Sequence, residues 1–423
     1  MIIHRPKKTI SGDRVRISAF IESESRPKLS DTLWFDLPSE FSEDISAQSN
    51  AFAAISMLPS MVLGEDLIVR GQLSPKLFHG LYQYQKIFHG WFPHMFKPVD
   101  IRCQDLAAET VDRTTQAEAA AFSGGIDSFY TLLRHSPAPG AGQDAGIRYL
   151  LLIGGFDIPL NDVRTFAAVK AAYKELAASR GLVLIDILTN FKKTGLAGTA
   201  PWILVGGSVL GAVAHVLSPK FFRYYIASSH KLEDDFHTSV HPTADPLLSL
   251  DNMEVIHDHP ASRVVKTRLV AMEPHSYRYL RVCWENKDGI NNCCRCQKCI
   301  RTMLTLDLIG ALGRYETFPF PLTRNVRGWA LYGEVAMSYA QEILEEARAL
   351  EREDLAADIE RAIRRSRVTL RLAQAAARPL FLDAQRTELL VYLFFRIHKV
   401  IYGPDHLWRV LRRRLTGPAA AGN

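Results

Sequence analysis

Two serines, two glycines and one aspartate occur within six residues, from Ser123 to Ser128. Glycines let the backbone turn tightly and let its N–H groups approach a ligand closely. Together with the serine hydroxyls and the start of a helix, such N–H groups form a cradle for an anion of phosphate size. Asp127 adds a carboxylate, which suits a Mg²⁺ ion between it and a bound phosphate. The spacing predicts a nucleotide-phosphate site, and a plain strand-to-helix turn that contains glycine is the alternative.

The second group of reactive residues is rich in cysteine. Five of the six cysteines fall between 283 and 299, where Cys293, Cys296 and Cys299 form a C-x-x-C-x-x-C run and Cys283 precedes them by one loop. Four thiolates with such spacing can close a tetrahedral shell around Zn²⁺, and similar spacings hold iron–sulfur clusters. The polar residues between them argue against cysteines that are merely buried. We expect a metal site and favour zinc over an iron–sulfur cluster. Because four thiolates leave no open coordination position, the metal would have a structural role.

The stretch around Ser123 differs from the Walker A and dinucleotide-binding patterns. It resembles the Ser-Gly-Gly-x-Asp-Ser signature of the PP-loop ATP pyrophosphatases, which cleave ATP between the α and β phosphates. This resemblance implies that Asp127 serves the metal and that the pyrophosphate end is held by Ser123, Gly124, Gly125 and Ser128. Phe122 and the pair Gly154-Gly155 complete the expected nucleotide-binding set. The glycine pair could let an adenine lie against backbone, with an ordinary turn as the alternative.

The loop and the cysteine run together are similar to the 7-cyano-7-deazaguanine synthase family, whose ATP-dependent enzymes turn a carboxylate into an amide and then a nitrile. The resemblance covers roughly residues 120–310 and implies that Cys283, Cys293, Cys296 and Cys299 hold zinc. Cys294 stands where that family has glycine. The loop between the first two cysteines is one residue longer here, and the family's base-recognition segments have no counterpart in this chain.

The resemblance implies an ATP-dependent ligase that forms AMP and pyrophosphate. A carboxylate or amide oxygen of a small substrate would attack the α-phosphorus, and ammonia or another nucleophile would then displace AMP. Basic side chains would offset charge on the leaving pyrophosphate, and the candidates are Lys231, Arg263, Lys266 and Arg301. Arg263 and Lys266 are three residues apart on an expected helix over 262–269, so both could face a polyphosphate. The alternative is that they form a solvated basic face of that helix. Two other functions stay open: a tRNA-modifying enzyme that binds RNA through a basic surface, and a nucleotide-binding module without turnover.

The hydrophobic pattern predicts the elements that position these residues. An apolar strand over 117–122 precedes the serine-glycine loop, and helical spacing follows it. Strand and helix then alternate, which predicts an α/β fold with a doubly wound parallel sheet of the HUP type, in which ligands bind beyond the carboxyl ends of the strands. The expected elements are strands over 149–153, 182–187 and 222–226 and helices over 163–179 and 201–217.

The flanking regions carry weaker signals. Residues 1–115 are expected to form a small α+β domain without an assigned role, with a strand over 14–21, a partner over 32–35 and a helix over 75–89 capped by Ser74. The ATP-binding domain would span 116–312, and 313–423 would be helical. Within 230–259 we expect a long, substrate-facing polar loop, whose histidines offer a second metal site as a weaker alternative. A C-terminal cluster of arginines (Arg409, Arg412, Arg413 and Arg414) is most simply a solvated helix end.

Bulk composition restricts the class of protein. The chain has 423 residues, 47% hydrophobic and 23% charged, which is ordinary for a soluble globular protein. A net charge of +6 permits an anionic substrate such as ATP but does not by itself indicate nucleic acid. We find no apolar run of bilayer length and no signal-peptide pattern. The clustered cysteines are unlike a secreted disulfide framework. A cytoplasmic protein without membrane contact is expected, and a homo-oligomer is compatible with these data.

Overall fold

The computed structural model describes residues 1–136, 146–234, 236–286, 289–322, 326, 329–331 and 333–377. They form two compact units. The first contains Met1–Ala261 with Tyr279–Arg281, and the second contains Ser262–Arg278 with the described residues of Val282–Asn423. Each unit is described by itself below.

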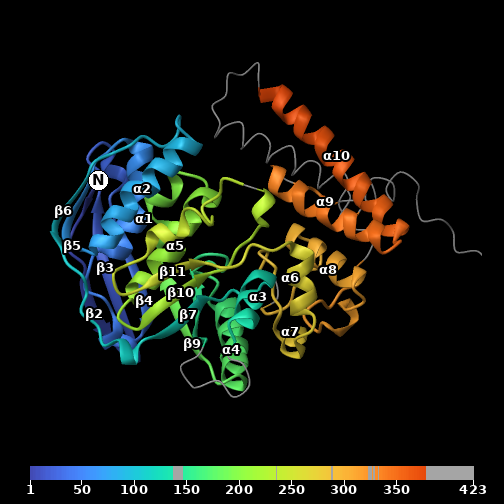
Figure 1. The fold of residues 1–423 in the computed structure, drawn as a ribbon, viewed down its shortest axis with the longest axis horizontal. Helices are drawn as coiled ribbons and strands as arrows, with labels where there is room; N and C mark the ends of the chain where they lie inside the picture. The colour runs from blue at the N-terminus through green and yellow to red at the C-terminus, as the bar shows by residue number, and fades with distance from the viewer. Residues whose placement is uncertain are drawn as a thin grey trace, which may run out of the picture. The chain divides into compact units, whose positions relative to one another are not determined.

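The first unit is built on one eleven-stranded sheet within the described residues, in the order β11-β10-β7-β8-β9-β4-β3-β1-β5-β6, with β2 beside β3 (Figure 1). The strands are β1 (Ile2–Ile3), β2 (Lys7–Ser11), β3 (Arg14–Glu22), β4 (Asp31–Pro38), β5 (Leu67–Leu73), β6 (Ile101–Leu106), β7 (Ala117–Ala121), β8 (Ile147–Gly154), β9 (Val183–Thr189), β10 (Phe221–Ile226) and β11 (Glu254–His257).

The half of the sheet from β11 to β9 is entirely parallel. Its connecting helices are α3 (Ile126–Arg134), α4 (Val163–Ser179) and α5 (Trp202–Val216). From β7 the chain adds β8 and β9 on one side, then crosses back to add β10 and β11 on the other. The strand order therefore reverses between β7 and β10, as in doubly wound sheets. The predicted alternation of strands and helices is confirmed here.

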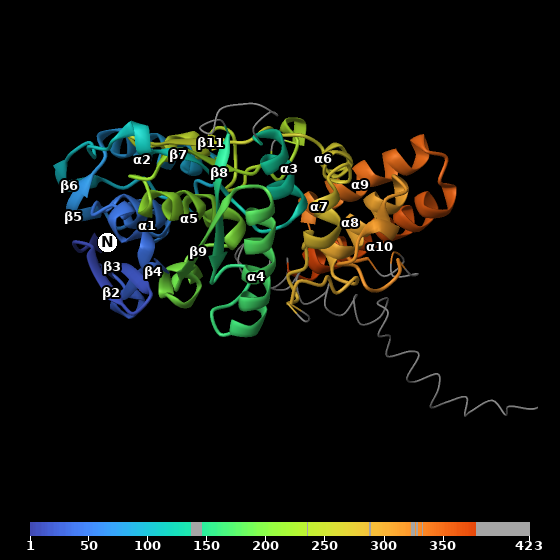
Figure 2. The same ribbon diagram turned by 90° about the horizontal axis from the view of Figure 1, so that it is seen from below.

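Helices cover the two faces of the sheet unequally. Right-handed crossovers place α3 and α4 on one face and α5 on the other, where it packs beside α1 (Asn50–Leu63) and α2 (Pro75–Trp91), as Figures 1 and 2 show. One hydrophobic core lies under α1, α2 and α5 and runs from the N-terminal strands to β11, including Phe35, Leu151 and Val255. α5 is apolar on most sides because it is packed between the sheet and α1.

Residues 1–115 share this sheet and core with the parallel half. β4 pairs with β9 in antiparallel orientation, and Asn190 bonds the β4 backbone at Trp34 N (2.9 Å). The Arg14 guanidinium joins Asp36 of β4 to Asp186 of β9 at 2.6 and 2.7 Å. The expected boundary near residue 115 therefore does not separate two compact units, because strand pairing between distant segments makes the sheet continuous.

The N-terminal elements follow the sequence pattern closely. β3 and β4 pair in antiparallel orientation, as predicted. Ser74 caps α2 by accepting a hydrogen bond from Leu77 N at 3.2 Å. The buried face of α2 includes four residues at helical spacing, each fully buried: Leu77, Leu81, Tyr84 and Phe88. α2 continues to Trp91, two residues beyond the expected end at 89.

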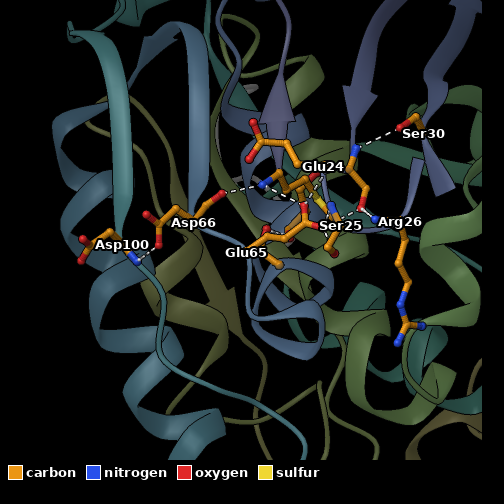
Figure 3. A network of polar contacts seen from close by, with 11 residues as sticks. Glu24, Ser25, Arg26, Ser30, Glu65, Asp66 and Asp100 are labelled. Carbon is orange, nitrogen blue, oxygen red and sulfur yellow. Dashed lines mark hydrogen bonds and ion pairs between the residues drawn. The ribbon is translucent and has the colours of Figure 1, made fainter. Parts of the chain in front are cut away.

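The N-terminal ammonium group is itself buried in this unit. Figure 3 shows the polar network around Glu65 and Asp66, the residues that it contacts. The ammonium group forms an ion pair with Glu65 at 3.0 Å and donates to the Asp66 carbonyl oxygen at 2.6 Å. Glu65 also accepts hydrogen bonds from the Ser23 hydroxyl and from Ser25. Burial by itself raises the pKa of Glu65, but the hydrogen bonds from Ser25, Ser23 and the ammonium group together lower this pKa to about 2. Glu65 therefore stays ionised and holds β1 against β5.

The polar stretch 230–259 is not one long loop. It contains β11, which extends the parallel sheet beside β10. Asp258 continues this pairing through a hydrogen bond from its N–H to the Ile226 carbonyl oxygen at 2.9 Å. Its carboxylate accepts from Thr131 and from His135, both at 2.7 Å, and so fixes α3 to the edge of the sheet.

The second unit is helical, with a core that includes Leu304, Trp329, Ile343 and Ile359. Its helices are α6 (Arg263–Val270), α7 (Pro274–Tyr279), α8 (Gln297–Leu308), α9 (Gly333–Ala349) and α10 (Glu353–Ala377). α9 and α10 lie within the region expected to be helical, and Glu351 between them has a positive φ of 55°. Because α6 and α8 pack with α9, this unit begins at 262 and not at the expected boundary of 313.

Some expectations fall on residues that the structure does not describe, namely most of the 136–146 loop and the C-terminal arginine cluster at 409–414. Across the part of the chain that is described, no helix combines the length and the apolar character needed to cross a membrane.

Candidate nucleotide-binding and metal sites

Phe122 anchors the serine-glycine loop by packing. Its ring is buried against Phe129 and Tyr173, with ring centroids 5.2 and 5.1 Å apart. Its N–H donates to the Leu151 carbonyl oxygen at 2.9 Å, beyond the last paired residue of β7. The side chain therefore fixes where the loop leaves the sheet and holds the segment that follows.

Gly124 is required by the fold itself. Its φ is +73°, and a Cβ atom there would lie 1.6 Å from the Tyr173 hydroxyl oxygen. That hydroxyl donates to the Ser123 carbonyl oxygen at 3.1 Å, and Arg281 N donates to the Gly124 carbonyl oxygen at 2.8 Å. Burial raises the pKa of Tyr173, so its hydroxyl stays protonated as a donor. Tyr173 and Arg281 shape this loop, and no sequence motif pointed to either of them.

Gly125 has no such packing reason. It caps the N-terminus of α3 with a φ of −81°, which any residue can adopt. A Cβ atom there would meet Ser123 Oγ at 3.4 Å and the Arg281 carbonyl oxygen at 3.8 Å, which are ordinary contacts. The missing side chain leaves the N-terminus of α3 accessible, as close approach by a ligand would require.

Polar groups gather around this helix start. Ser128 Oγ donates to the Gly125 carbonyl oxygen at 3.0 Å and lies 3.4 Å from Ser123 Oγ. Ser123 is exposed, and Asp127, in the first turn of α3, is half-buried. Hydroxyls, helix N–H groups and a carboxylate are the set of groups that phosphate and Mg²⁺ would use, so the donor set fits both.

The loop lies at the point where the strand order reverses. β7 and β10 are adjacent parallel strands, so the segments that follow them leave the same edge of the sheet. Lys231 is in the segment after β10, with its Nζ 3.8 Å from the Asp234 carboxylate. Ser228 Oγ donates to the His230 carbonyl oxygen at 2.8 Å and shapes this turn. Lys231 and the serine-glycine loop thus share the carboxyl edge, where doubly wound proteins bind ligands.

Packing explains Gly154 and Gly155 without a ligand. A Cβ atom on Gly154 would lie 2.5 Å from Leu188 Cδ2. Gly155 has a φ of +97°, and a Cβ atom there would lie 2.1 Å from the Thr189 carbonyl oxygen. These contacts account for both glycines as a tight turn against β9, so their role at an adenine stays a prediction.

The other basic candidates belong to the second unit. Arg263 and Lys266 are 5% and 1% exposed, so the alternative of a solvated basic face does not hold for either. Arg301, on α8, stacks its guanidinium on the Tyr339 ring at 4.1 Å, and that of Arg263 lies 5.1 Å from the same ring centroid. The structure thus brings Arg263 and Arg301 together on Tyr339, whereas Lys231 and the serine-glycine loop are in the first unit.

The four predicted cysteines converge in the second unit. The Sγ atoms of Cys283, Cys293, Cys296 and Cys299 all lie within 4.8 Å of one another. Two of the separations are 3.8 Å (Cys293–Cys299) and 3.4 Å (Cys296–Cys299). A tetrahedral ion with Zn–S bonds of about 2.3 Å places its sulfurs about 3.8 Å apart. The cluster therefore has the dimensions of a site that could hold one metal ion such as zinc.

Backbone groups and one buried asparagine support this cluster. Cys296 N donates to Cys293 Sγ at 3.3 Å, and Glu285 N donates to Cys283 Sγ at 3.4 Å. The Asn292 side-chain oxygen accepts from Val282 N (2.8 Å) and Cys283 N (3.1 Å). The Thr317 carbonyl oxygen accepts from the Asn292 backbone N–H at 2.8 Å and from its side-chain Nδ2 at 3.2 Å. Asn292 therefore joins the two halves of the cysteine loop, a role that the sequence pattern does not reveal.

The hydrogen bonds among the four thiols divide them into two pairs: the pKa values of Cys283 and Cys293 are lowered, and those of Cys296 and Cys299 are raised. Hydrogen bonds from the thiols of Cys293, Cys296 and Cys299 hold the pKa of Cys283 well below its usual range. Cys294, the spare cysteine, instead donates to the Asn292 carbonyl oxygen, and burial raises its pKa. Cys294 also has a φ of +56°, in the left-handed region that favours glycine.

The histidines of 230–259 serve other contacts. His257 Nδ1 lies 2.7 Å from the buried Asp245 carboxylate, and His241 Nδ1 accepts from Thr243 N at 3.1 Å. Among the described residues, the four cysteines are the one group of metal-ligating side chains whose ligand atoms gather so closely. A second metal site therefore has no support in the described part of the chain.

Fold and site together define an α/β protein with a mostly parallel multistranded sheet and a four-cysteine cluster that could bind a metal ion. Comparison of the chain with protein-family models, with curated proteins and with solved structures finds no match.

Proposed function

We propose that this protein is an ATP-dependent ligase with a HUP-type, PP-loop nucleotide site, similar to 7-cyano-7-deazaguanine synthase. It would activate a carboxylate or amide as an adenylate and then transfer ammonia or another nucleophile. The observation that carries the proposal is the position of the Ser-Gly-Gly-x-Asp-Ser loop at the N-terminus of α3, beside β10, where the strand order reverses. Such a crevice is the usual ligand site of doubly wound sheets.

The residues around Gly125 supply what a polyphosphate needs. The N–H groups at the start of α3 and the hydroxyls of Ser123 and Ser128 would donate to phosphate oxygens. Asp127 would hold Mg²⁺, which when bound neutralises phosphate charge. Lys231 shares the carboxyl edge and would offset charge on the leaving group. The role of Arg263, Lys266 and Arg301, which belong to the second unit, stays a prediction from the sequence.

The proposed reaction has two displacements. A substrate oxygen bonds to the α-phosphorus while the bond from that phosphorus to the bridging oxygen breaks, and pyrophosphate leaves with the electron pair. Ammonia then bonds to the activated carbon, AMP leaves, and a proton passes to a base. The chain's own part is to orient the triphosphate and to stabilise the leaving oxyanion.

The cysteine cluster would hold zinc in a structural role. Sulfurs that all lie within 4.8 Å of one another suit one ion better than a multi-iron cluster, in which different thiolates bind different irons and are spread further apart.

The first test measures products and compares two glycine variants. The wild-type protein is incubated with ATP, ammonia and a panel of carboxylic acids, and AMP, pyrophosphate, ADP and amides are quantified by mass spectrometry. We expect AMP and pyrophosphate in equal amounts. Gly125→Ala, whose Cβ fits the fold, should keep its unfolding midpoint but weaken ATP binding by about tenfold or more.

The matched control is Gly124→Ala, which the structure predicts to be destabilised by contact with Tyr173. Release of ADP and phosphate alone would overturn the adenylation proposal. Tight ATP binding without any product would favour the non-catalytic nucleotide-binding module. Unchanged ATP affinity in folded Gly125→Ala would place the nucleotide elsewhere.

A further inference from the structure

The N-terminal half of the sheet has one face that the described helices leave uncovered. Along β3 the side chains of Val15, Ile17, Ala19 and Ile21 point into the core under α1 and α2. The alternate side chains point to the opposite face, which α3 and α4 cover only over the parallel half (Figures 1 and 2). On this outer face, Arg16, Phe20 and Arg70 are exposed.

A concavity of about 530 Å³ opens on this face. It lies between the end of β1 and the start of β2, both of which pair with β3 in antiparallel orientation, and beside β5, the parallel partner of β1. Its volume falls within the ~300–1,000 Å³ typical of ligand sites. The lining consists of His4, Arg5, Lys7, Ser18, Phe20, Thr32, Arg70 and Gln104.

The lining residues of this concavity carry positive charge only. Its lining residues include three cations and no carboxylate. Within the described residues, Arg5, Lys7 and Arg70 form no ion pair, and Arg5 Nε donates only to the Arg70 carbonyl oxygen at 3.2 Å. By contrast, Arg14 and Arg16 on the same strand face are both paired with Asp36. The three cations of the concavity are therefore available to an anion from solution.

An aromatic ring lies among these cations. Phe20 is 43% exposed, and its ring centroid lies 5.5 Å from that of His4, which pairs with Glu22 at 2.9 Å. A phenylalanine on an open strand face, with cations around it, is the combination that single-stranded nucleic acids use: the base stacks on the ring and the phosphates contact the cations.

We propose that this concavity binds single-stranded nucleic acid. Arg5, Lys7 and Arg70 contact successive phosphates, and Phe20 stacks on a base. The lining residues carry three cations and no carboxylate of their own, and the nearby Glu22 is paired with His4, so the concavity favours an anionic ligand over a basic one. The exposed aromatic ring favours bases over a plain acidic peptide. This binding is independent of the proposed ATP chemistry, so either can fail alone.

The test measures fluorescence anisotropy of the full chain with labelled oligonucleotides of about 12 residues, oligo-U and oligo-dT, between about 50 and 200 mM salt. The charge variant is Arg5→Ala/Lys7→Ala/Arg70→Ala. We expect it to bind at least about tenfold more weakly and to reduce the slope of log K against log salt by about 2. The matched control removes three exposed cations outside the concavity: Arg26→Ala/Lys28→Ala/Lys193→Ala.

The stacking contact is tested by two substitutions at one position. Phe20→Leu should weaken binding by roughly 5- to 100-fold, and Phe20→Tyr should restore it, because only the aromatic variant keeps a stacking surface. Circular dichroism melts check that each variant is folded. If the triple variant is unfolded, the single variant Arg70→Gln replaces it as the charge variant. Tighter oligo-U than oligo-dT binding would indicate contact with the ribose hydroxyl, and equal binding would also support the proposal.

Four results would overturn it. The first is that the wild-type chain does not bind at the lowest salt, and the second is that the charge variant and its control lose affinity equally. The third is tighter binding of a duplex than of the single strand. The fourth is that an oligoglutamate peptide competes equally well. The last result would assign the concavity to acidic peptides.

Discussion

The two neighbouring glycines of the serine-glycine loop, Gly124 and Gly125, have different structural reasons for being glycine. Gly124 has a positive φ and lies against Tyr173, so the fold alone demands glycine there. Gly125 has an ordinary φ and room for a Cβ atom, so the fold does not demand it. A ligand that approaches the start of α3 would explain the second glycine. The argument for a nucleotide site is therefore strongest at Gly125.

Glu65 carries a buried charge in the first unit, paired with the N-terminal ammonium group. Glu65→Gln leaves the buried Met1 ammonium group without its counter-charge, so we expect the free energy of unfolding at pH 7 to fall by about 3–5 kcal/mol. The pKa of Glu65 is lowered from 4.5 to about 2, so its stabilisation is complete above pH 4.5 and lost as the pH falls through 2.

Urea denaturation of both proteins at pH 7 and near pH 2 checks this prediction. The difference between wild type and Glu65→Gln should shrink at the lower pH. The exposed Glu24→Gln is the matched control and should change little at either pH. An equal loss for Glu65→Gln at both pH values would show that its charge is not the cause.

Among the elements, the cysteine loop before α8 combines a good ligand geometry with a strained cysteine. Asn292 and the N–H···S bonds hold the four ligand sulfurs together. Cys294 has a φ of +56°, which a side chain with a Cβ atom adopts at a cost. Cys294 is the one cysteine of this loop that is outside the four-cysteine cluster. It occupies the position at which the 7-cyano-7-deazaguanine synthase family has glycine.

Cys294→Gly should therefore keep its metal and gain up to about 1 kcal/mol of stability, with the relief of strain partly offset by the lost buried side chain. Cys294→Val should lose stability, because a β-branched residue is poorly tolerated at positive φ. Thermal melts and metal analysis measure both effects. Cys296→Ser is the comparison that should lose the metal, and equal metal loss in Cys294→Gly would show that Cys294 is a ligand.

At the scale of the whole molecule, the described residues form two units with different sources of stability. The first has a sheet with a core that extends from β3 to β11. The second has a smaller helical core beside the cysteine cluster. Coupling of metal binding to folding should therefore be confined mainly to the second unit.

Metal removal tests this division. After treatment with a strong chelator, we expect the loss of about one metal ion per chain and faster hydrogen exchange in 289–308, α6 and α9. Exchange in β7, β8 and β10 should stay near its original rate. Faster exchange that begins in those central strands would contradict the division, and readdition of Zn²⁺ should restore protection of α8.

The sequence alone was sufficient for features that depend on residues close together in the chain. The ligand set of Cys283, Cys293, Cys296 and Cys299 follows from spacing within one short segment. The alternation of strands and helices from β7 to β10 follows from local periodicity, as does the burial of one face of α2. The serine-glycine loop was likewise placed correctly between a strand and a helix.

Only the tertiary structure decided how distant segments combine. The pairing of β4 with β9 joins residues 1–115 to the parallel sheet, and β11 forms because β10 offers it a partner. The burial of Lys266 and the role of Asn292 depend on neighbours far along the chain. The physical reason is that periodicity reports which side of an element is apolar, whereas strand partners and the contacts of each polar group are set by long-range packing.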